Sequence, residues 1–171
     1  MRKSIAELIR RDKPLVFRIT PALEMLIDSN ERCVIDTLKE HGLYRSDLIY
    51  RGVNVSNWQG ILTSGTDRAG LNYDYNKSDY AEANLELIRR GFKPGDFFYG
   101  GAESQLGTGD ADDPIDCAFF GGEGTPVLIV YDPDKVVDKR GEQPDLYFFK
   151  DGKKKGALVA LFVWEDIQLF Y

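Results

Sequence analysis

The stretch "IYRGVNVSNWQGILTSGTDRAG", from Ile49 to Gly70, decides how this chain is interpreted. A short apolar run of β type is followed at once by the charged Arg51 and by Gly52. About ten residues later, a short helical pattern leads into a second corner, "TSG" at residues 63–65. We expect the strand to stop at Arg51 and Gly52. The corner is then either a nucleotide-binding corner or only a tight turn.

The bulk composition limits the class of protein. A chain of 171 residues fits one domain, because domains usually contain roughly 100–200 residues. The composition, 43% hydrophobic and 29% charged, is typical of a folded globular protein. The formal net charge of −6 repels phosphate backbones, so it disfavours non-specific nucleic-acid binding.

The few ligand-type residues argue against a metal or disulfide framework. Cys33, Cys117 and His41 are too few for a standard Cys/His zinc site. The acidic residues between 103 and 116 do not have the spacing of an EF-hand loop. The N-terminus has no apolar signal core, and no run approaches the roughly 18 residues of a membrane span. We therefore expect a reduced, metal-free cytoplasmic protein without a membrane partner.

The pattern changes along the chain from helical to β-rich. Residues 1–47 are expected to be helical, with helices starting near Ser4, Pro21 and Asn30 and the third closed by Gly42. From residue 48 onward there are short β runs: "LIYRG", "DFFYG", "TPVLIVYDP", "DLYFFK" and "GALVALFVWED". One helix, "SDYAEANLELIRRG", interrupts them.

These patterns predict an α+β fold. "DGKKKG", at residues 151–156, is typical of a hairpin turn and favours antiparallel pairing of the strands on either side of it. We expect a single domain over residues 1–171. Its helical N-terminal part spans 1–47 and its β core 48–171.

The opening stretch resembles the first nucleotide-binding corner of ADP-ribosyltransferases, including the poly(ADP-ribose) polymerase and diphtheria-toxin-like branches. In those proteins a strand ends in His-Gly or Arg-Gly, and a short helix with an Ile-Leu-x-x-Gly pattern follows, as "WQGILTSG" does here. An aromatic strand end, a helix rich in small and aromatic residues and an apolar strand closed by a Pro turn come next. "GDFFYGG", "DPIDCAFFGG" and "PVLIVYDPDKV" follow in that order. The resemblance covers about residues 48–171 and implies a split, mostly antiparallel β core of ADP-ribosyltransferase type.

The resemblance also implies which residues bind NAD. Arg51 would donate to a phosphate or ribose oxygen, Gly52 would let the backbone approach nicotinamide, and Ser64 would bond ribose or diphosphate. Tyr99 would stack on the nicotinamide ring, because only one of Phe98 and Tyr99 can face a cleft. Each has a plain alternative: Arg51 pairs with an acid, Gly52 makes an ordinary turn, Ser64 is a loop residue and Tyr99 fills the core.

The catalytic carboxylate departs from the family pattern. The family has a Glu near the start of the last apolar strand, whereas Ala157 and Ala160 occupy those places here. Glu165 shares a strand face with Val159, Leu161 and Val163 if residues alternate, so it is our hypothesis for the catalytic acid. The alternative is that Glu165 only caps the end of the strand. The long loop "YGGAESQLGTGDADDP" suits a mobile lid or substrate loop.

Two classes of function follow. The first is an effector-like ADP-ribosyltransferase that uses NAD as a substrate and modifies a protein or nucleic-acid acceptor that the sequence does not identify. The second is a non-catalytic α+β binding module, such as an immunity or adaptor protein. The missing Glu favours the second class, and the Arg51-Gly52 corner favours the first.

Overall fold

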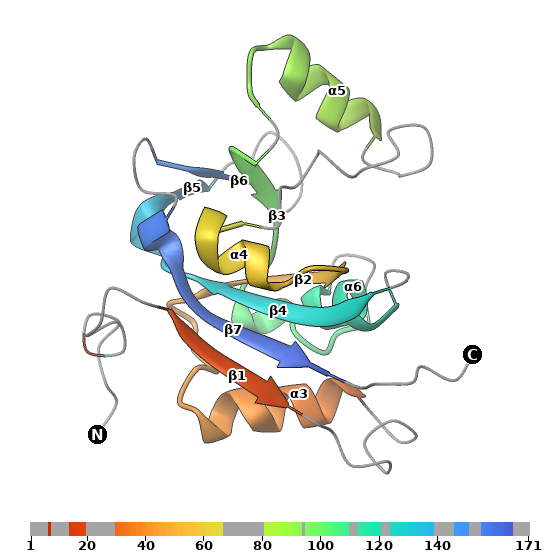
Figure 1. Ribbon diagram of the computed structural model, residues 1–171, viewed down its shortest axis with the longest axis vertical. Helices are drawn as coiled ribbons and strands as arrows, with labels where there is room; N and C mark the ends of the chain where they lie inside the picture. The colour runs from red at the N-terminus through yellow and green to blue at the C-terminus, as the bar shows by residue number, and fades with distance from the viewer. Residues whose placement is uncertain are drawn as a thin grey trace.

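A computed structural model of the chain describes residues 7, 14–19, 30–66, 81–93, 95–109, 113–120, 124–138, 146–150 and 155–165. These residues form two β-sheets with helices on their outer sides (Figure 1). Strand pairing is antiparallel everywhere except between the first and last strands. The fold is therefore mixed α and β with mostly antiparallel sheets.

The larger sheet, sheet A, has four strands in the order β1-β7-β4-β2. Their bounds are Leu15–Ile19 for β1, Ile49–Val55 for β2, Thr125–Tyr131 for β4 and Leu158–Trp164 for β7. The two central strands are runs of β-branched and aromatic residues, which favour the pleated conformation. All seven residues of β7 are buried, because both faces of sheet A are covered.

The smaller sheet, sheet B, has three antiparallel strands in the order β3-β6-β5. Their bounds are Phe97–Tyr99 for β3, Val136–Asp138 for β5 and Leu146–Phe149 for β6. One isolated bridge, between Tyr50 of β2 and Gly101, links the edges of the two sheets. The sheets are thus joined in the region that follows β3.

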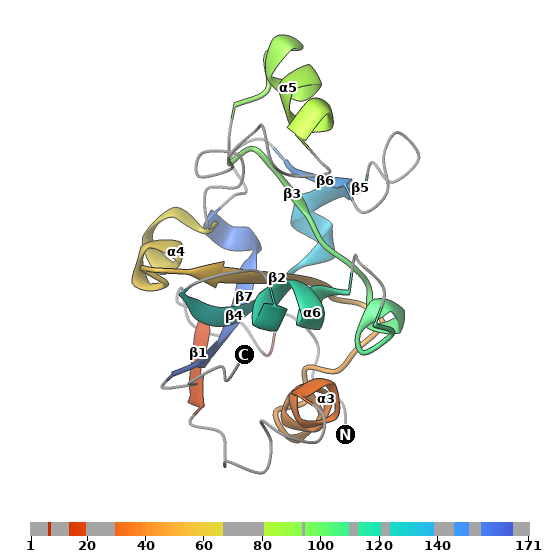
Figure 2. The ribbon, with the colours of Figure 1, turned by 90° about the vertical axis from the view of Figure 1, so that its right-hand side faces the viewer.

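Helices cover the remaining faces (Figures 1 and 2). The α-helices are Asn30–Glu40 (α3), Gln59–Ser64 (α4), Ala81–Arg89 (α5) and Pro114–Phe120 (α6), and the 3-10 turns are Glu103–Gln105 (η1), Pro133–Lys135 (η2) and Lys155–Ala157 (η3). Residues of α3 and α6 pack on one face of sheet A. Sheet B and α4 cover the other face, and α5 lies on the far side of sheet B.

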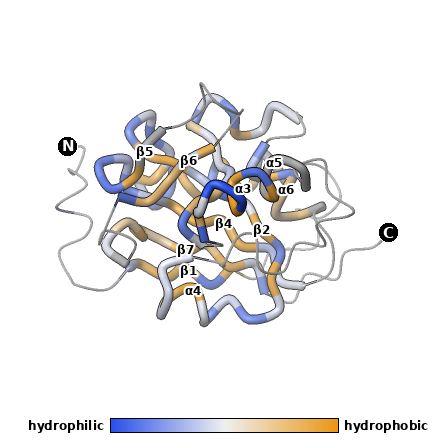
Figure 3. The backbone as a smooth tube through the Cα atoms, turned by 90° about the horizontal axis from the view of Figure 1, so that it is seen from above, coloured by the Kyte–Doolittle hydropathy of each residue, from blue (hydrophilic) through white to orange (hydrophobic). Residues whose placement is uncertain are grey.

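Four aromatic rings meet in the otherwise mainly aliphatic core between the sheets. The ring of Phe98 lies 4.6 Å from that of Tyr131, 5.3 Å from that of Tyr147 and 5.1 Å from that of Phe149. In Figure 3 the backbone is coloured hydrophobic along much of β4 and β7, in the middle of the molecule. The two sheets therefore pack directly against each other here.

The prediction that residues 1–47 contain only helices is wrong, because β1 lies among them. Leu15, Phe17 and Ile19 are partly buried and pack toward α3, whereas Val16 and Arg18 are exposed. This period of two is that of a strand, and β1 gains its hydrogen bonds from β7, at the other end of the chain. The third predicted helix is confirmed as α3, and Gly42 follows it with a φ of 71°. The first two predicted helices lie largely or wholly outside the described residues.

The prediction that the strand stops at Arg51 and Gly52 is also wrong. β2 continues to Val55, and Gly52 pairs with Leu128 inside the strand. A Cβ atom at Gly52 would lie 1.5 Å from the carbonyl oxygen of Pro114. Gly52 is therefore needed because α6 packs directly on the backbone of β2.

The predicted antiparallel pairing of the strands on either side of residues 151–156 is wrong, because β6 belongs to sheet B and β7 to sheet A. The alternation predicted along β7 holds only from Ala160 onward. Tyr131 pairs with Leu158 and Val130 with Ala160, so Val159 is an extra residue in a bulge. Val159 therefore packs on the same side as Ala160, with α3 and α6.

The close packing of β2 on α6 makes Gly52 a sensitive position. We expect Gly52→Ala to lower the free energy of unfolding by about 3 kcal/mol or more, because a backbone carbonyl blocks the methyl group. Urea denaturation measures the change. Gly60→Ala is the matched control, since only Asn57 Nδ2, at 3.9 Å, lies near its Cβ position. This control should be neutral or stabilising by up to about 1 kcal/mol. Equal stability of Gly52→Ala and the wild type would contradict the packing.

Candidate functional site

The candidate site is the place where the two sheets join, which we call the sheet junction. It consists of Tyr50, Arg51, Tyr99, Gly100 and Gly101. The backbone N–H and C=O of Tyr50 exchange hydrogen bonds of 2.8 Å with those of Gly101. One residue on, Arg51 Nη1 donates to the carbonyl of Tyr99, also at 2.8 Å. Gly100 must be Gly, since a Cβ atom there would lie 2.6 Å from the carbonyl oxygen of Tyr50.

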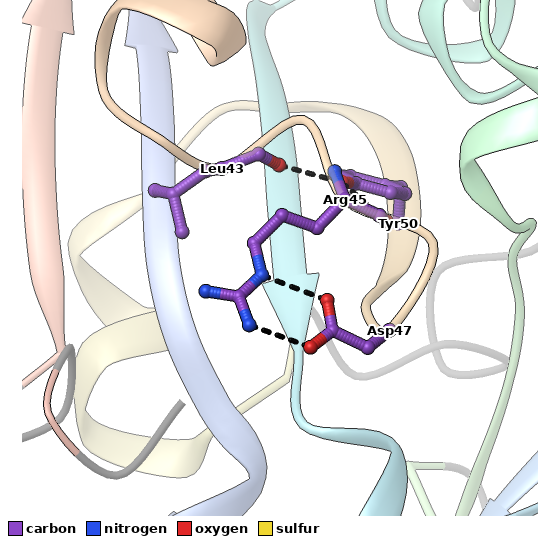
Figure 4. Close-up of polar contacts among 4 residues, drawn as sticks. All are labelled: Leu43, Arg45, Asp47 and Tyr50. Atoms are coloured by element: carbon purple, nitrogen blue, oxygen red, sulfur yellow. Dashed lines mark hydrogen bonds and ion pairs between the residues drawn. The ribbon is translucent and has the colours of Figure 1, made fainter. Parts of the chain in front are cut away.

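The side chain of Tyr50 fixes the start of β2 (Figure 4). Its buried hydroxyl donates to the carbonyl of Leu43 at 2.5 Å and accepts from the backbone N–H of Arg45 at 2.9 Å. Arg45 is held in turn by two hydrogen bonds to the carboxylate of Asp47, of 2.8 and 2.6 Å. The loop that enters β2 therefore has one fixed conformation.

Arg51 lies on the face of sheet A that meets sheet B. It shares this face of β2 with Ile49 and Val53, which belong to the core between the sheets. The residue is only 5% exposed. A buried guanidinium group requires hydrogen-bond acceptors, and the carbonyl of Tyr99 supplies one. Arg51 thus ties the middle of β2 to the end of β3.

The backbone carbonyl and the side chain of Tyr99 make contacts on different sides of sheet B. Its carbonyl accepts from Arg51, whereas its half-buried ring packs edge-on against Phe97, 6.4 Å between ring centroids. Phe97 and Tyr99 share the cluster beneath α5, and Phe98 points the other way, into the core between the sheets. The alternation expected for this strand end is therefore present. Of the two aromatic residues, Tyr99 is the one with solvent exposure.

Gly52 and Ser64 lie apart from these contacts. Gly52 faces α6, on the opposite side of sheet A from Arg51. Ser64 ends α4, and its hydroxyl donates to the carbonyl oxygens of Gly60 and Thr66. Gly65, the next residue, accepts a hydrogen bond from the hydroxyl of Tyr131. Ser64 thus closes a helix that is anchored to sheet A, and its role toward a ligand stays a prediction.

The structure does not bring Glu165 to Arg51. Arg51 of β2 pairs with Ile129 of β4, and Ile129 pairs with Leu161 of β7. Glu165 lies four residues after Leu161 in the chain. The two Cα atoms are therefore separated by about 13 Å along the strands and about 10 Å across them. Arg18 Nε and Nη2 donate to the two carboxylate oxygens of Glu165 at 2.9 and 2.8 Å. The carboxylate of Glu165 is thus paired at the opposite edge of sheet A.

The Gly-rich loop after Tyr99 is partly packed over residues 100–109 and 113. Gly101 and Leu106 are buried, and Gln105 Oε1 accepts from the backbone N–H of Ala102 at 2.8 Å. Asp113 is fully buried, and its two carboxylate oxygens accept from the N–H groups of Gly109 and Ile115 at 3.1 and 2.9 Å. Hydrogen bonds within the chain therefore hold the described part of this loop, and the expected mobile lid stays a prediction.

The sequence patterns did not single out Tyr50, which fixes the loop before β2, or Asp113, which fixes the loop before α6. Asp113 had a visible signal, because Asp followed by Pro is a typical start of a helix. Tyr50 had no such signal, since a Tyr in an apolar run is an ordinary strand residue.

Comparison with known proteins gives no relative: no family model, curated protein or solved structure matches the chain. No helix among the described residues is long and apolar enough to cross a membrane. Within the same part of the chain, His, Cys, Asp and Glu form no group of three or more that would hold a metal ion. The function therefore has to follow from the geometry of the sheet junction.

The hydroxyl of Tyr50 gives a test of the junction. We expect Tyr50→Phe to lower the free energy of unfolding by about 1–3 kcal/mol, because the buried N–H of Arg45 and carbonyl of Leu43 lose their partner. Burial raises the pKa of the Tyr50 hydroxyl well above its usual value of about 10. The folded protein thus keeps this proton after the unfolded chain has lost it.

This contribution to stability is complete below pH 10 and is lost as the pH rises from there toward the raised pKa. The stability difference between the wild type and Tyr50→Phe should then shrink by up to about 1.4 kcal/mol per pH unit. Urea unfolding of both proteins at several pH values from 9 upward measures it. A constant difference across this range would contradict a buried, neutral hydroxyl.

Proposed function

We propose that the chain binds NAD at the sheet junction and transfers ADP-ribose to a macromolecular acceptor, as an ADP-ribosyltransferase-like protein. The observation that carries the proposal is the buried guanidinium of Arg51, which is held between two sheets and bonded to the end of an aromatic strand. Such a group supplies planar donors for a ribose or phosphate oxygen.

The chemistry of NAD cleavage explains why this arrangement is suitable. Breaking the bond between nicotinamide and ribose passes through an oxocarbenium-like state, which needs fixed donors, an aromatic wall and a carboxylate. Arg51 supplies the donors on the core side of sheet B, and Tyr99 supplies the half-exposed ring on its other side. Tyr50 and Gly101 keep their backbones fixed, so the groups are held in place before the ligand arrives.

The order of the elements supports the same proposal. β2, α4, β3, α6 and β4 follow one another as the corresponding segments do in the resembling family. The two sheets, joined by one isolated bridge, agree with a split and mostly antiparallel core.

The position of Glu165 favours the second function, a non-catalytic binding module. Its carboxylate is paired with Arg18 and lies far along β7 from Arg51. If no other acid serves the junction, the chain would bind its ligand without cleaving it. NAD binding and NAD cleavage therefore need separate tests.

We expect calorimetric titration to show NAD binding and Arg51→Ala to weaken it about ten- to a hundredfold, because a charge-assisted hydrogen bond is lost. Arg51→Lys should recover part of the affinity, since Lys keeps the charge but not the planar donors. Thermal melting of each variant verifies that the junction has stayed folded. Lys150→Ala, which removes an exposed cation after β6, is the control for a general charge effect. Equal NAD affinity of the folded Arg51→Ala and the wild type would exclude Arg51 as a ligand-binding residue.

The acid that NAD cleavage requires has three candidates. Glu165 is described, and it is paired with Arg18 and distant from Arg51. Asp145 and Asp151 lie outside the described residues and are candidates by their place in the sequence alone.

Nicotinamide release by the purified protein tests the three acids. Removing the carboxylate opposite the developing oxocarbenium ion should lower the rate by about a hundredfold or more. We expect Glu165→Gln to keep the rate of the wild type, because its carboxylate is paired with Arg18, and Asp145→Asn and Asp151→Asn to show which of the other two acids is needed. A loss of activity in Glu165→Gln alone would identify Glu165 as the acid. Absence of release by every protein, with NAD still bound, would establish the binding module.

A further inference from the structure

The outer face of sheet B carries a row of aromatic rings. The ring of Phe148 lies 4.6 Å from that of Phe92 and 6.1 Å from that of Phe97, and Phe97 contacts Tyr99. Phe97 and Phe148 are buried, whereas Phe92 and Tyr99, at the two ends, are partly exposed. The half-exposed ring of Tyr99 is therefore reached from the α5 side of sheet B.

The described side chains of α5 cover this row mainly through Leu87. From Leu85 to Arg89, Leu87 is buried, and Leu85 and Ile88 are partly buried. Glu86 and Arg89 are 59% and 71% exposed and contact each other on the outside. Figures 1 and 2 both show α5 at the end of the molecule, separated from sheet A by sheet B. On its described side chains, α5 is held to sheet B mainly by Leu87, and an element held by few buried apolar groups is among the first to open in a folded protein.

Phe92 belongs to the same unit as α5. The N–H of Phe92 donates to the carbonyl of Leu87 at 3.1 Å, and the N–H of Gly91 donates to that of Ile88 at 3.0 Å. With Gly91 at a φ of 95°, this is a Schellman motif, in which the residue after Gly packs back on the helix. Leu87 and Phe92 therefore cover the row together.

A single turn connects this unit to sheet B. The N–H of Asp96 donates to the carbonyl of Lys93 at 3.0 Å, and the Asp96 carboxylate accepts from the N–H of Lys93 at 3.1 Å. Gly95 has a φ of 89°, and β3 begins at Phe97. A displacement of α5 with Phe92 can thus be absorbed next to this turn, without breaking the pairs of sheet B.

We infer that α5 and Phe92 form a hinged cover over the outer face of sheet B, and that its opening exposes the row from Phe148 to Tyr99 to a flat aromatic ligand. The inference rests on the proposed function only for the ligand, a nicotinamide or adenine ring of NAD. Stacking on Phe97, which is buried beneath α5, would then require the cover to lift. The apparent affinity for NAD is reduced by the fraction of molecules that are closed.

Hydrogen exchange tests the cover without any ligand. We expect the backbone amides of α5 to exchange at least about tenfold faster than those of β3 and β6, because α5 opens locally. Leu87→Ala should accelerate exchange in α5 further and leave β4 and β7 unchanged. Glu86→Gln, on the exposed side of α5, is the matched control and should exchange as the wild type does. Protection of α5 equal to that of β3 would overturn the inference.

Titration with NAD then links the cover to binding. Leu87→Ala should bind NAD more tightly than the wild type, because less free energy is spent on opening. Unchanged affinity would overturn the link between the cover and NAD binding. Absence of NAD binding would contradict the proposed function, and the hydrogen-exchange result would then decide on the cover alone. Weaker binding by a folded Leu87→Ala would show that α5 contributes to the site, and would overturn its role as a cover.

Discussion

The hydrogen bonds of Tyr50 hold the rest of the structure in place. Its hydroxyl closes the loop between α3 and β2, and its backbone pairs with Gly101. The side chain thereby sets where β2 starts, and the backbone sets where sheet B meets sheet A. Because a buried hydroxyl without partners is unfavourable, the loop and the strand must adopt this arrangement together. The position of Arg51, one residue later, follows from it.

Two glycines allow the backbones to come as close as this arrangement demands. Gly52 gives α6 room on one side of β2, and Gly100 gives the carbonyl of Tyr50 room at the junction. The amide of Asn54, two residues after Gly52, donates to the carbonyl of Ala118 and so fixes α6 on β2. β2 is therefore held on both faces, by a helix and by the second sheet. This explains why a strand with Arg and Gly in its middle remains regular.

The sequence patterns predicted elements better than they predicted contacts. Caps and a period of 3.6 identified α3 and α5, and apolar runs identified β4 and β7, because these signals are local. β1 was missed because its partner β7 lies almost at the other end of the chain, where no local pattern refers to it. The hairpin at residues 151–156 failed for a related reason: turn residues do not specify to which sheet the next strand belongs.

The candidate site shows the same limit. The Arg-Gly pattern pointed to Arg51, and strand alternation showed that only one of Phe98 and Tyr99 can face a cleft. Neither pattern predicts the pair of Glu165 with Arg18, which are 147 residues apart in the sequence. That pairing depends on β1, which the helical reading of residues 1–47 left out. Missing β1 therefore also hid the ion pair in which the expected carboxylate takes part.

The burial of Arg51 links ligand binding to the contact between the sheets. A guanidinium group taken out of water is stable only with acceptors, and the carbonyl of Tyr99 is one of them. A ribose or phosphate oxygen that reaches Arg51 adds a stronger, charge-assisted acceptor at the same place. The ligand would therefore tighten the joint between β2 and β3 as it binds, and would stabilise the folded chain in proportion to its occupancy. Since Tyr99 also carries the ring on the outer face, the same residue connects Arg51 in the core with the surface beneath α5.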